Sequence, residues 1–283
     1  MKKFLTYVCI FAALVLALLI PAEIYVESIP NPARDKHEWM KAHATEVETL
    51  VLGSSHTFYG IMPSELGDRA FSLAQVSQTY DYDLRLLRQY DMPKLKRVIL
   101  PYSYFSLWEE KGEPLRYRIY MDGDTPLLPF EFTNLPVFRE KLKSLYKPAE
   151  LSWDSLGFGT NYTFEKRPEP WDNGKERAKA NTYPDKEELV AKNVGILNEI
   201  AETCKAKGVR LTLVTTPTRT LFRKSEDTRQ KEINRRELEK FLKNHPEVEY
   251  SDFESDTRFT PGDFYDADHL NTAGARKLTS FLR

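Results

Sequence analysis

The sequence of 283 residues is poor in cysteine and has no excess of either charge. Its two cysteines are Cys9, inside an apolar run near the N-terminus, and Cys204, in a segment with helical periodicity. The folded part therefore has no cysteine pair for an internal disulfide, and a cysteine-based metal site is excluded. Lys and Arg total 41 against 42 Asp and Glu. Because this balance provides no strongly basic surface, we expect no nucleic-acid partner.

The longest uncharged stretch of the chain runs from Phe4 to Ile20, directly after two lysines. As a helix it would extend roughly 25 Å at 1.5 Å per residue, which is just enough to cross a bilayer. The residues that follow lack a clear small-x-small signal-peptide cleavage pattern. We therefore expect residues 1–22 to form an uncleaved single-pass membrane anchor. The positive-inside rule leaves the N-terminus in the cytoplasm and places the chain from Glu23 onward outside it, in the periplasm or at the cell surface.

Strand-like and helix-like segments alternate after a proline-containing juxtamembrane linker at residues 23–44. Short β-rich apolar runs predict strands, and apolar residues three or four positions apart predict amphipathic helices. The expected strands are 46–52, 70–74, 97–100, 209–215 and 248–251, and the expected helices are 79–90, 185–207, 227–244 and 272–282. This order is typical of an α/β domain, here at residues 45–283, built as a three-layer sandwich with a mainly parallel central sheet.

An aromatic- and proline-rich stretch at about residues 108–183 interrupts this alternation. A structureless insertion of that length is unusual in a compact domain, so we expect it to pack as a cap or subdomain over the open edge of the sheet. Ligands of open parallel sheets bind beyond the carboxyl ends of the strands. Candidate functional residues are therefore sought at those ends.

The first polar motif at a strand end is Gly53-Ser54-Ser55-His56, immediately after the first expected strand. A hydroxyl in this position is exposed to a ligand while the sheet holds its backbone, and the glycine permits a sharp turn. Serine is also a favoured N-cap residue, so the motif could instead begin the next helix. Taken alone, the motif leaves a nucleophile and a helix cap as alternatives.

The second motif, Asp266-Ala267-Asp268-His269-Leu270-Asn271, directly precedes the last expected helix. His269 can act as a general base near neutral pH, and Asp266 can hold its imidazole in the required tautomer. Alternatively, Asp268 or Asn271 caps the helix and His269 is a surface residue.

A metal hydrolase is a third alternative, in which His56, Asp266, Asp268 and His269 converge on an ion. Their spacing does not repeat a helix-borne ligand pair such as His-Glu-x-x-His. We therefore expect neither a metal site nor a cofactor.

Together the two motifs resemble those of the SGNH, or GDSL-like, hydrolase superfamily. Its members carry the nucleophile in a Gly-x-Ser block after the first strand and an Asp-x-x-His pair before the last helix. Gly53-Ser54-Ser55 and Asp266-x-x-His269 match these blocks, and His-Leu-Asn-Thr-Ala-Gly continues the second match. The resemblance implies the SGNH, flavodoxin-like fold and a catalytic triad in which Ser55 is the nucleophile, His269 the base and Asp266 the orienting acid.

The superfamily blocks that supply a glycine amide and an asparagine side chain to the oxyanion hole have no match here. Ala74-Gln75-Val76-Ser77-Gln78 follows the second expected strand, and Pro101-Tyr102-Ser103-Tyr104 follows the third. Losing one oxyanion donor typically costs about 2.7–4 kcal/mol of transition-state stabilisation. The Ser55 amide should remain available, and the candidate additional donors are Ser77, Gln78 and Ser103.

A single anchor, a Gly-Ser-Ser loop and altered middle blocks resemble the membrane-associated branch of the superfamily that acts on cell-envelope polymers. Its relatives include the alginate O-acetyltransferases and the D-alanyl transfer proteins of teichoic acid synthesis. The resemblance implies an extracytoplasmic serine esterase or O-acyltransferase that acts on acyl esters, above all acetyl esters, of carbohydrate or a small molecule, with a membrane partner in acyl transfer. The alternative is a non-catalytic carbohydrate-binding or scaffold protein that retains the fold.

Overall fold

The computed structural model describes the chain except residues 28–31, 68, 111–151, 164 and 167–171. The chain divides into two compact units. The first comprises Met1–His37 and Gly112–Leu151, and the second comprises Glu38–Lys111 and Ser152–Arg283. Much of the insertion expected at 108–183 falls outside the described residues, so its packing as a cap stays a prediction. The candidate site described below lies within the second unit.

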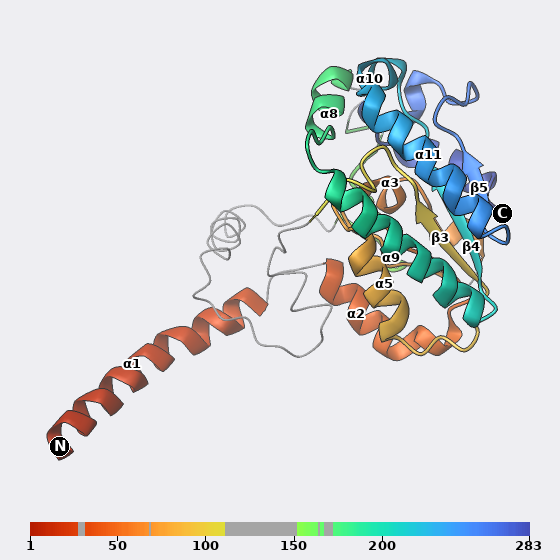
Figure 1. Ribbon diagram of the computed structural model, residues 1–283. Coiled ribbons are helices and arrows are strands. Elements are labelled where there is room, and N and C mark those ends of the chain that lie inside the picture. Colours follow the sequence, from red (N-terminus) through yellow and green to blue (C-terminus); the bar gives the residue numbers. More distant parts are fainter. Residues whose placement is uncertain (28–31, 68, 111–151, 164, 167–171) are drawn as a thin grey trace. The chain divides into compact units, whose positions relative to one another are not determined.

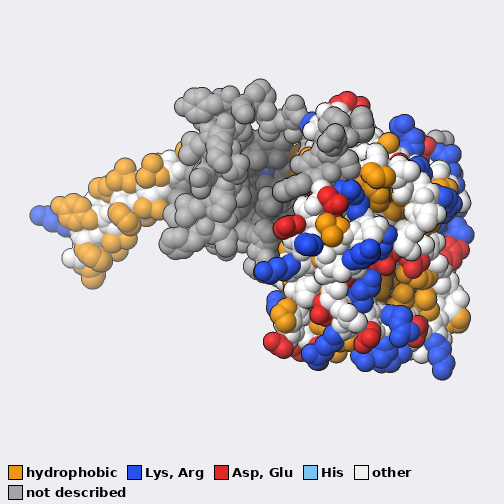
Figure 2. Space-filling model, turned by 90° about the horizontal axis from the view of Figure 1, so that it is seen from above, with side chains coloured by type: hydrophobic (Ala, Val, Ile, Leu, Met, Phe, Trp, Pro, Cys, Tyr) orange, Lys and Arg blue, Asp and Glu red, His pale blue; other side chains and the backbone are white. Residues whose placement is uncertain are grey.

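The apolar N-terminal run forms helix α1 (Lys2–Glu27). Large apolar side chains of this helix are exposed, among them Phe4, Phe11 and Leu18, and they cover much of its surface in Figure 2. Over the described stretches of the chain, no helix is both long and apolar enough to cross a membrane. The transmembrane span expected at residues 1–22 is therefore not shown.

Part of the linker expected at residues 23–44 is helical, forming α2 (Pro32–His43). Pro32 is the first residue of this helix, a position where the missing N–H group of proline costs nothing. Asp35 near the start and Lys41 near the end complement the helix dipole. Proline thus marks the start of a helix here, where the sequence pattern suggested a connector.

Five parallel strands form the sheet of the second unit, in the order β2-β1-β3-β4-β5. They are β1 (Thr49–Val51), β2 (Ala70–Ser72), β3 (Arg97–Pro101), β4 (Arg210–Thr215) and β5 (Glu249–Asp252). Each strand lies within one or two residues of its expected range or inside it. Strands β1, β2 and β3 are apolar and almost wholly buried, as expected for parallel strands covered on both faces. The predicted α/β class and parallel sheet are confirmed.

Helices α5 (Tyr80–Gln89), α9 (Glu187–Ala206) and α11 (Thr228–Asn244) lie side by side over the sheet (Figure 1). Val51, Ile99 and Val214 of the three central strands pack against Leu278 of α12 (Thr272–Ser280). The remaining helical segments of the described residues are short and were not expected from the sequence. They are α3 (Ser55–Phe58), α4 (Pro63–Leu66), α8 (Gly174–Ala180), α10 (Thr220–Ser225), and the 3-10 turns η1 (Ala44–Glu46) and η3 (Pro261–Asp263).

The strand order reverses between β1 and β3. From β1 the chain passes to β2 on one side and then returns to β3 on the other. Parallel α/β sheets bind ligands beyond the carboxyl ends of their strands at such a reversal. The loops that leave β1 and β3 at this point carry Ser55 and Ser103.

Candidate active site

The turn after β1 places Ser55 at the carboxyl edge of the sheet. Gly53 has a φ of 104°, and a Cβ atom there would lie 2.1 Å from the Cδ of Pro101, so only glycine fits. Ser55 is the first residue of α3, and the N-cap position belongs to Ser54, whose side chain makes no capping hydrogen bond. The helix-cap alternative therefore does not account for the Ser55 hydroxyl.

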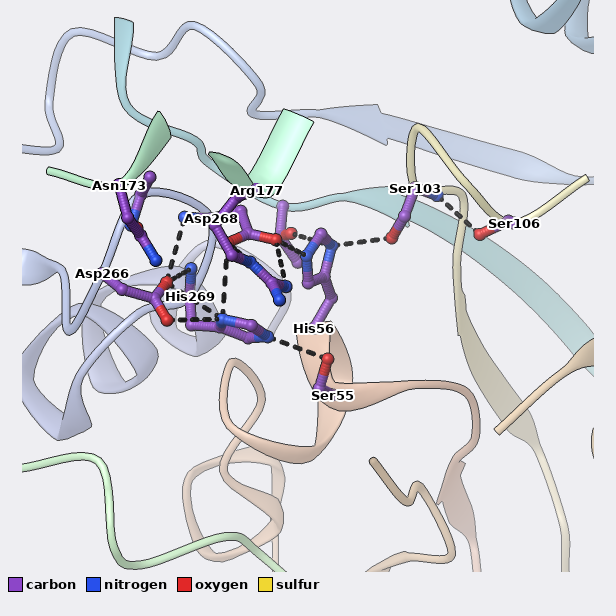
Figure 3. Close-up of polar contacts among 11 residues, drawn as sticks. Ser55, His56, Ser103, Ser106, Asn173, Arg177, Asp266, Asp268 and His269 are labelled. Carbon is purple, nitrogen blue, oxygen red and sulfur yellow. Dashed lines mark hydrogen bonds and ion pairs between the residues drawn. The ribbon is translucent and has the colours of Figure 1, made fainter. Parts of the chain in front are cut away.

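Ser55, His269 and Asp266 lie in hydrogen-bond contact, as Figure 3 shows. His269 Nε2 is 2.8 Å from Ser55 Oγ, and His269 Nδ1 is 3.0 and 3.1 Å from the two carboxylate oxygens of Asp266. When Nδ1–H donates to Asp266, Nε2 carries the lone pair that accepts the Ser55 hydroxyl proton. All three side chains are buried. This arrangement can deprotonate Ser55 as it attacks an electrophilic carbon.

The loop before α12 is held by its own side chains. Asp266 Oδ1 accepts the backbone N–H groups of Asp268 at 3.1 Å and of His269 at 2.9 Å. Asn271 caps α12 by accepting the N–H groups of the two residues at positions 273 and 274. Of the helix-cap alternatives, Asn271 therefore takes that role, Asp268 does not, and His269 is buried rather than a surface residue.

A second hydrogen-bonded network adjoins the triad (Figure 3). Arg177 on α8 holds both carboxylate oxygens of Asp268, with Nε 2.8 Å from Oδ1 and Nη2 2.7 Å from Oδ2. His56 Nε2 lies 3.4 Å from Oδ2, and Ser103 Oγ lies 2.7 Å from His56 Nδ1. The His56 and His269 rings meet edge to face with centroids 5.3 Å apart.

The charges of the two networks set the proton affinities of the site. Burial alone would lower the pKa of His269, but the carboxylates of Asp268 and Asp266 outweigh it and raise that pKa. Burial lowers the pKa of His56 in spite of the opposing Asp268 carboxylate. Burial would raise the pKa of Asp268, yet His269, His56 and Arg177 hold it well below the ordinary value. The buried Asp268 is therefore a carboxylate anion.

Three residues of the metal-site alternative do converge, because ligand-type atoms of His56, Asp268 and His269 lie within 4.8 Å of one another. Both oxygens of Asp268 are occupied by Arg177, whose positive charge opposes a cation. Both nitrogens of His269 are engaged, by Asp266 and Ser55. These donors fit a hydrogen-bonded network better than a metal site.

Two of the candidate additional oxyanion donors make side-chain contacts with other residues, and their assignment stays a prediction. Ser103 Oγ lies 2.7 Å from His56 Nδ1, and Ser103 donates its N–H group to the Oγ of Ser106. Gln78 donates its side-chain N–H group to Asp83 at 2.7 Å. Ser77 differs from them, because its φ of 62° is in the left-handed region that residues other than glycine rarely adopt. Ser77, in the loop after β2, thus has a backbone conformation that is usual for glycine.

Further N–H groups, of Ser55 and Gln75, lie in the nucleophile turn and in the loop beside it. The amide of Ser55 is in the first turn of α3, where backbone N–H groups have no partner within the helix. The backbone N–H group of Gln75 donates to the oxygen of Gly53 at 2.9 Å and ties the loop after β2 to the turn. The side-chain Nε2 of Gln75 is buried and has no hydrogen-bond partner within the described part of the chain. Sequence reasoning did not single out Gln75.

Three stacked tyrosines lie beside His269. The rings of Tyr59 and Tyr162 are 3.7 Å apart, those of Tyr162 and Tyr265 are 3.9 Å apart, and both pairs are nearly parallel. The Tyr162 ring centroid is 5.5 Å from that of His269. Tyr162 and Arg177 both belong to the segment expected to be an insertion. Its aromatic richness was the only sequence signal for Tyr162, and no spacing pattern marked Arg177.

Asp83 is a buried carboxyl group behind the nucleophile turn. Its Oδ1 accepts the N–H group of Gly53 at 2.8 Å and the side-chain N–H group of Gln78. Burial raises the pKa of Asp83 to about 7, although these two hydrogen bonds oppose the shift. The residue that holds the turn is therefore largely neutral below pH 7.

We expect the free energy of unfolding of the domain to fall as the pH rises, because the folded chain holds Asp83 in its protonated form. The folded pKa of about 7 lies above the unfolded value, so the stabilisation is complete below about pH 4 and is lost as the pH rises to about 7. At 1.36 kcal/mol per pKa unit, the loss is at most about 4 kcal/mol. The Asp83→Asn variant keeps an oxygen for Gly53 and should lack this loss. Urea unfolding of both proteins at pH 5 and pH 8 checks the expectation, and an identical pH dependence would refute it.

Comparison with known proteins gives distant similarities only. No protein-family model matches the sequence, and a search of the curated proteins finds no relative. Similar solved structures include a GDSL-like lipase from Bacteroides thetaiotaomicron, with 13% identity, 86% of this chain and 94% of that chain covered, and a TM-score of 0.42. They also include a proposed acylhydrolase from Bacteroides fragilis, with 12% identity, 87% and 96% covered, and a TM-score of 0.41. Similarity at this level assigns no function to the chain.

Proposed function

We propose that this protein is a serine hydrolase or acyltransferase of ester substrates, with Ser55 as nucleophile, His269 as general base and Asp266 as the orienting acid. The observation that carries the proposal is the 2.8 Å contact between Ser55 Oγ and His269 Nε2, made by the imidazole that contacts Asp266 through its other nitrogen. The match of both motifs to the SGNH blocks supports the same roles.

In the proposed reaction Ser55 Oγ attacks the ester carbonyl carbon while His269 Nε2 takes the hydroxyl proton. The carboxylate of Asp266 stabilises the resulting imidazolium. The tetrahedral intermediate then collapses, and His269 returns the proton to the oxygen of the leaving alcohol, which leaves an acyl ester on Ser55. Water or an acceptor hydroxyl, deprotonated by His269, releases the acyl group. Hydrolysis and transfer differ only in this acceptor.

The negative oxygen of the tetrahedral intermediate needs preorganised N–H donors. We assign the Ser55 amide as the first donor. The loop after β2 offers two candidates for the second, namely the backbone of Ser77, with its left-handed φ, and the side-chain Nε2 of Gln75, which has no hydrogen-bond partner among the described residues.

The rate of ester hydrolysis should rise with pH through the pKa of His269. Only the neutral imidazole accepts a proton, and the neighbouring carboxylates place this pKa above the ordinary value of 6.5. We expect kcat/KM for a chromogenic acetyl ester to be low at pH 5, to be still rising at pH 7 and to reach its plateau only at higher pH. A profile with full activity at pH 5 would contradict the role of His269 as base.

The proposed substrate is an acylated carbohydrate, most directly an acetyl ester of an envelope polysaccharide. The resemblance to the envelope-acting branch supports it, and the partly exposed Tyr162 and Tyr265 offer aromatic surface beside His269. The location outside the cytoplasm and the membrane partner in acyl transfer are further proposals. They rest on the uncharged run from Phe4 to Ile20, whose side chains are largely exposed on α1.

The rival function is a non-catalytic carbohydrate-binding or scaffold protein. A binding module has no need of a serine hydroxyl hydrogen-bonded to a histidine that is itself oriented by a carboxylate. The contacts of Ser55 and His269 therefore favour catalysis over this rival.

A further inference from the structure

We propose that Arg177 is a positioning residue of the Ser55 site, which neutralises Asp268 and so keeps His269 in the form that accepts a proton. This inference rests on the proposed function, because it concerns the base of that reaction. Arg177 lies on α8, in the segment between β3 and β4, and its side chain reaches into the group of residues around His269 (Figure 3).

The contact between Arg177 and Asp268 has the geometry of a bidentate arginine–carboxylate pair. Two nitrogens of the planar guanidinium group each face one oxygen of Asp268, at 2.8 and 2.7 Å. Such bidentate pairs fix the orientation of the carboxylate as well as its charge. The Asp268 side chain is fully buried, whereas that of Arg177 is 31% exposed. The arginine therefore brings a positive charge from the edge of the site to an anion that water does not reach.

His269 faces two carboxylates, not one. Its Nδ1 lies 3.0 Å from Asp266 Oδ1 and 3.5 Å from Asp268 Oδ1. Two uncompensated negative charges beside a buried imidazole would favour the protonated ring, which cannot act as a base. Arg177 cancels one of them. The pKa of His269 responds to these groups in that way, raised by Asp268 and Asp266 and lowered by Arg177.

Arg177 is the permanent positive charge beside Asp268, and the other groups that lower the pKa of that carboxyl are His269 and His56. The Asp268 carboxylate can only accept, so the N–H group of His56 is on Nε2 and is directed at Asp268, and Nδ1 accepts the hydroxyl of Ser103. Burial lowers the pKa of His56, so this ring contributes a hydrogen bond and no charge near neutral pH. The polar and aromatic groups that face His269 are Ser55, His56, Tyr59, Tyr162, Arg177, Asp266 and Asp268.

Three variants test the proposal through the pH at which activity appears. Arg177→Met should move the acidic limb of the kcat/KM profile to higher pH, with roughly tenfold lower kcat/KM at pH 6.5 for a shift of one unit and recovery at higher pH. Asp268→Asn should move the limb to lower pH. The double variant Arg177→Met/Asp268→Asn removes both charges and should return the midpoint close to that of the natural chain.

Arg276→Met is the matched control, because Arg276 on α12 contacts the surface residue Glu65 and should leave the midpoint unchanged. A purely structural role of Arg177 would lower the plateau rate without moving the midpoint, and that result would overturn the proposal.

NMR titration of the His269 imidazole, with its signal assigned by comparison with His269→Gln, measures the same pKa shift independently of activity. The natural chain could hydrolyse no ester while Arg177→Met still raises the titration midpoint of His269. In that case the proposed function fails, while the coupling of Arg177, Asp268 and His269 stands. No shift in either measurement overturns the coupling.

Discussion

Replacement of Ser55 by alanine should lower kcat for a chromogenic acetyl ester by about 10⁴- to 10⁶-fold. The Ser55 hydroxyl is placed to form the acyl ester, since its oxygen lies 2.8 Å from the base. Removing the oxygen leaves His269 and the oxyanion donors in position but takes away the covalent step. Steady-state kinetics and a thermal unfolding curve of the variant provide the measurement, and we expect the curve to be unchanged within a few degrees.

Ser54→Ala is a closely matched control for Ser55→Ala. Ser54 is the preceding residue, is equally buried, and its hydroxyl has no hydrogen-bond partner in the described part of the chain. We expect Ser54→Ala to keep kcat within a few-fold of the natural value. Equal losses in both variants would indicate that disturbance of the turn, and not loss of the nucleophile, explains the result.

Asp266→Asn should lower kcat by about 10⁴-fold, as the equivalent change does in a well-studied Ser-His-Asp enzyme. The carboxylate receives Nδ1–H of His269 and thereby leaves Nε2 free to accept the Ser55 proton. An amide can turn its N–H group to Nδ1 and favour the tautomer with the proton on Nε2, which cannot act as a base. Steady-state kinetics between pH 5 and pH 9 measure this loss.

The pH profile separates this loss from simple protonation of His269. Raising the pH should restore activity to a protonated base, but it should not restore Asp266→Asn, because its tautomer and not its charge is wrong. Asp268→Asn provides the comparison, since Asp268 is not the main hydrogen-bond acceptor of His269 and its loss should mainly move the midpoint. Activity of Asp266→Asn within tenfold of the natural chain would contradict the role given to Asp266.

The elements predicted correctly are those whose residue pattern is visible within a short stretch of sequence. Strands β1 and β3 are short apolar runs that end at a glycine turn and at a proline, and α9 is long enough to display helical periodicity. The helix α2 was missed because proline in a charged segment suggests a linker, although Pro32 occupies the first turn. Segments of four to seven residues such as α3 and α8 are too short to show a period.

The triad residues could be proposed from sequence because each lies in a compact motif at the end of a predicted element. Arg177 could not, because its contact with Asp268 joins residues 91 positions apart and no periodic pattern marks it. The oxyanion assignments of Ser103 and Gln78 stay predictions for a related reason. Both side chains are buried, and Ser103 Oγ and Gln78 Nε2 contact partners, His56 and Asp83, that only the folded chain brings near.

The most direct test of the central claim is to find which residue becomes covalently modified by a fluorophosphonate. Intact-mass measurement followed by peptide mapping should show one adduct, on Ser55. The adduct should be lost in Ser55→Ala, strongly reduced in His269→Gln and retained in Ser54→Ala, because the reaction requires the activated Ser55 oxygen. Absence of any adduct on the natural chain, or an adduct on Ser54 instead, would contradict the account.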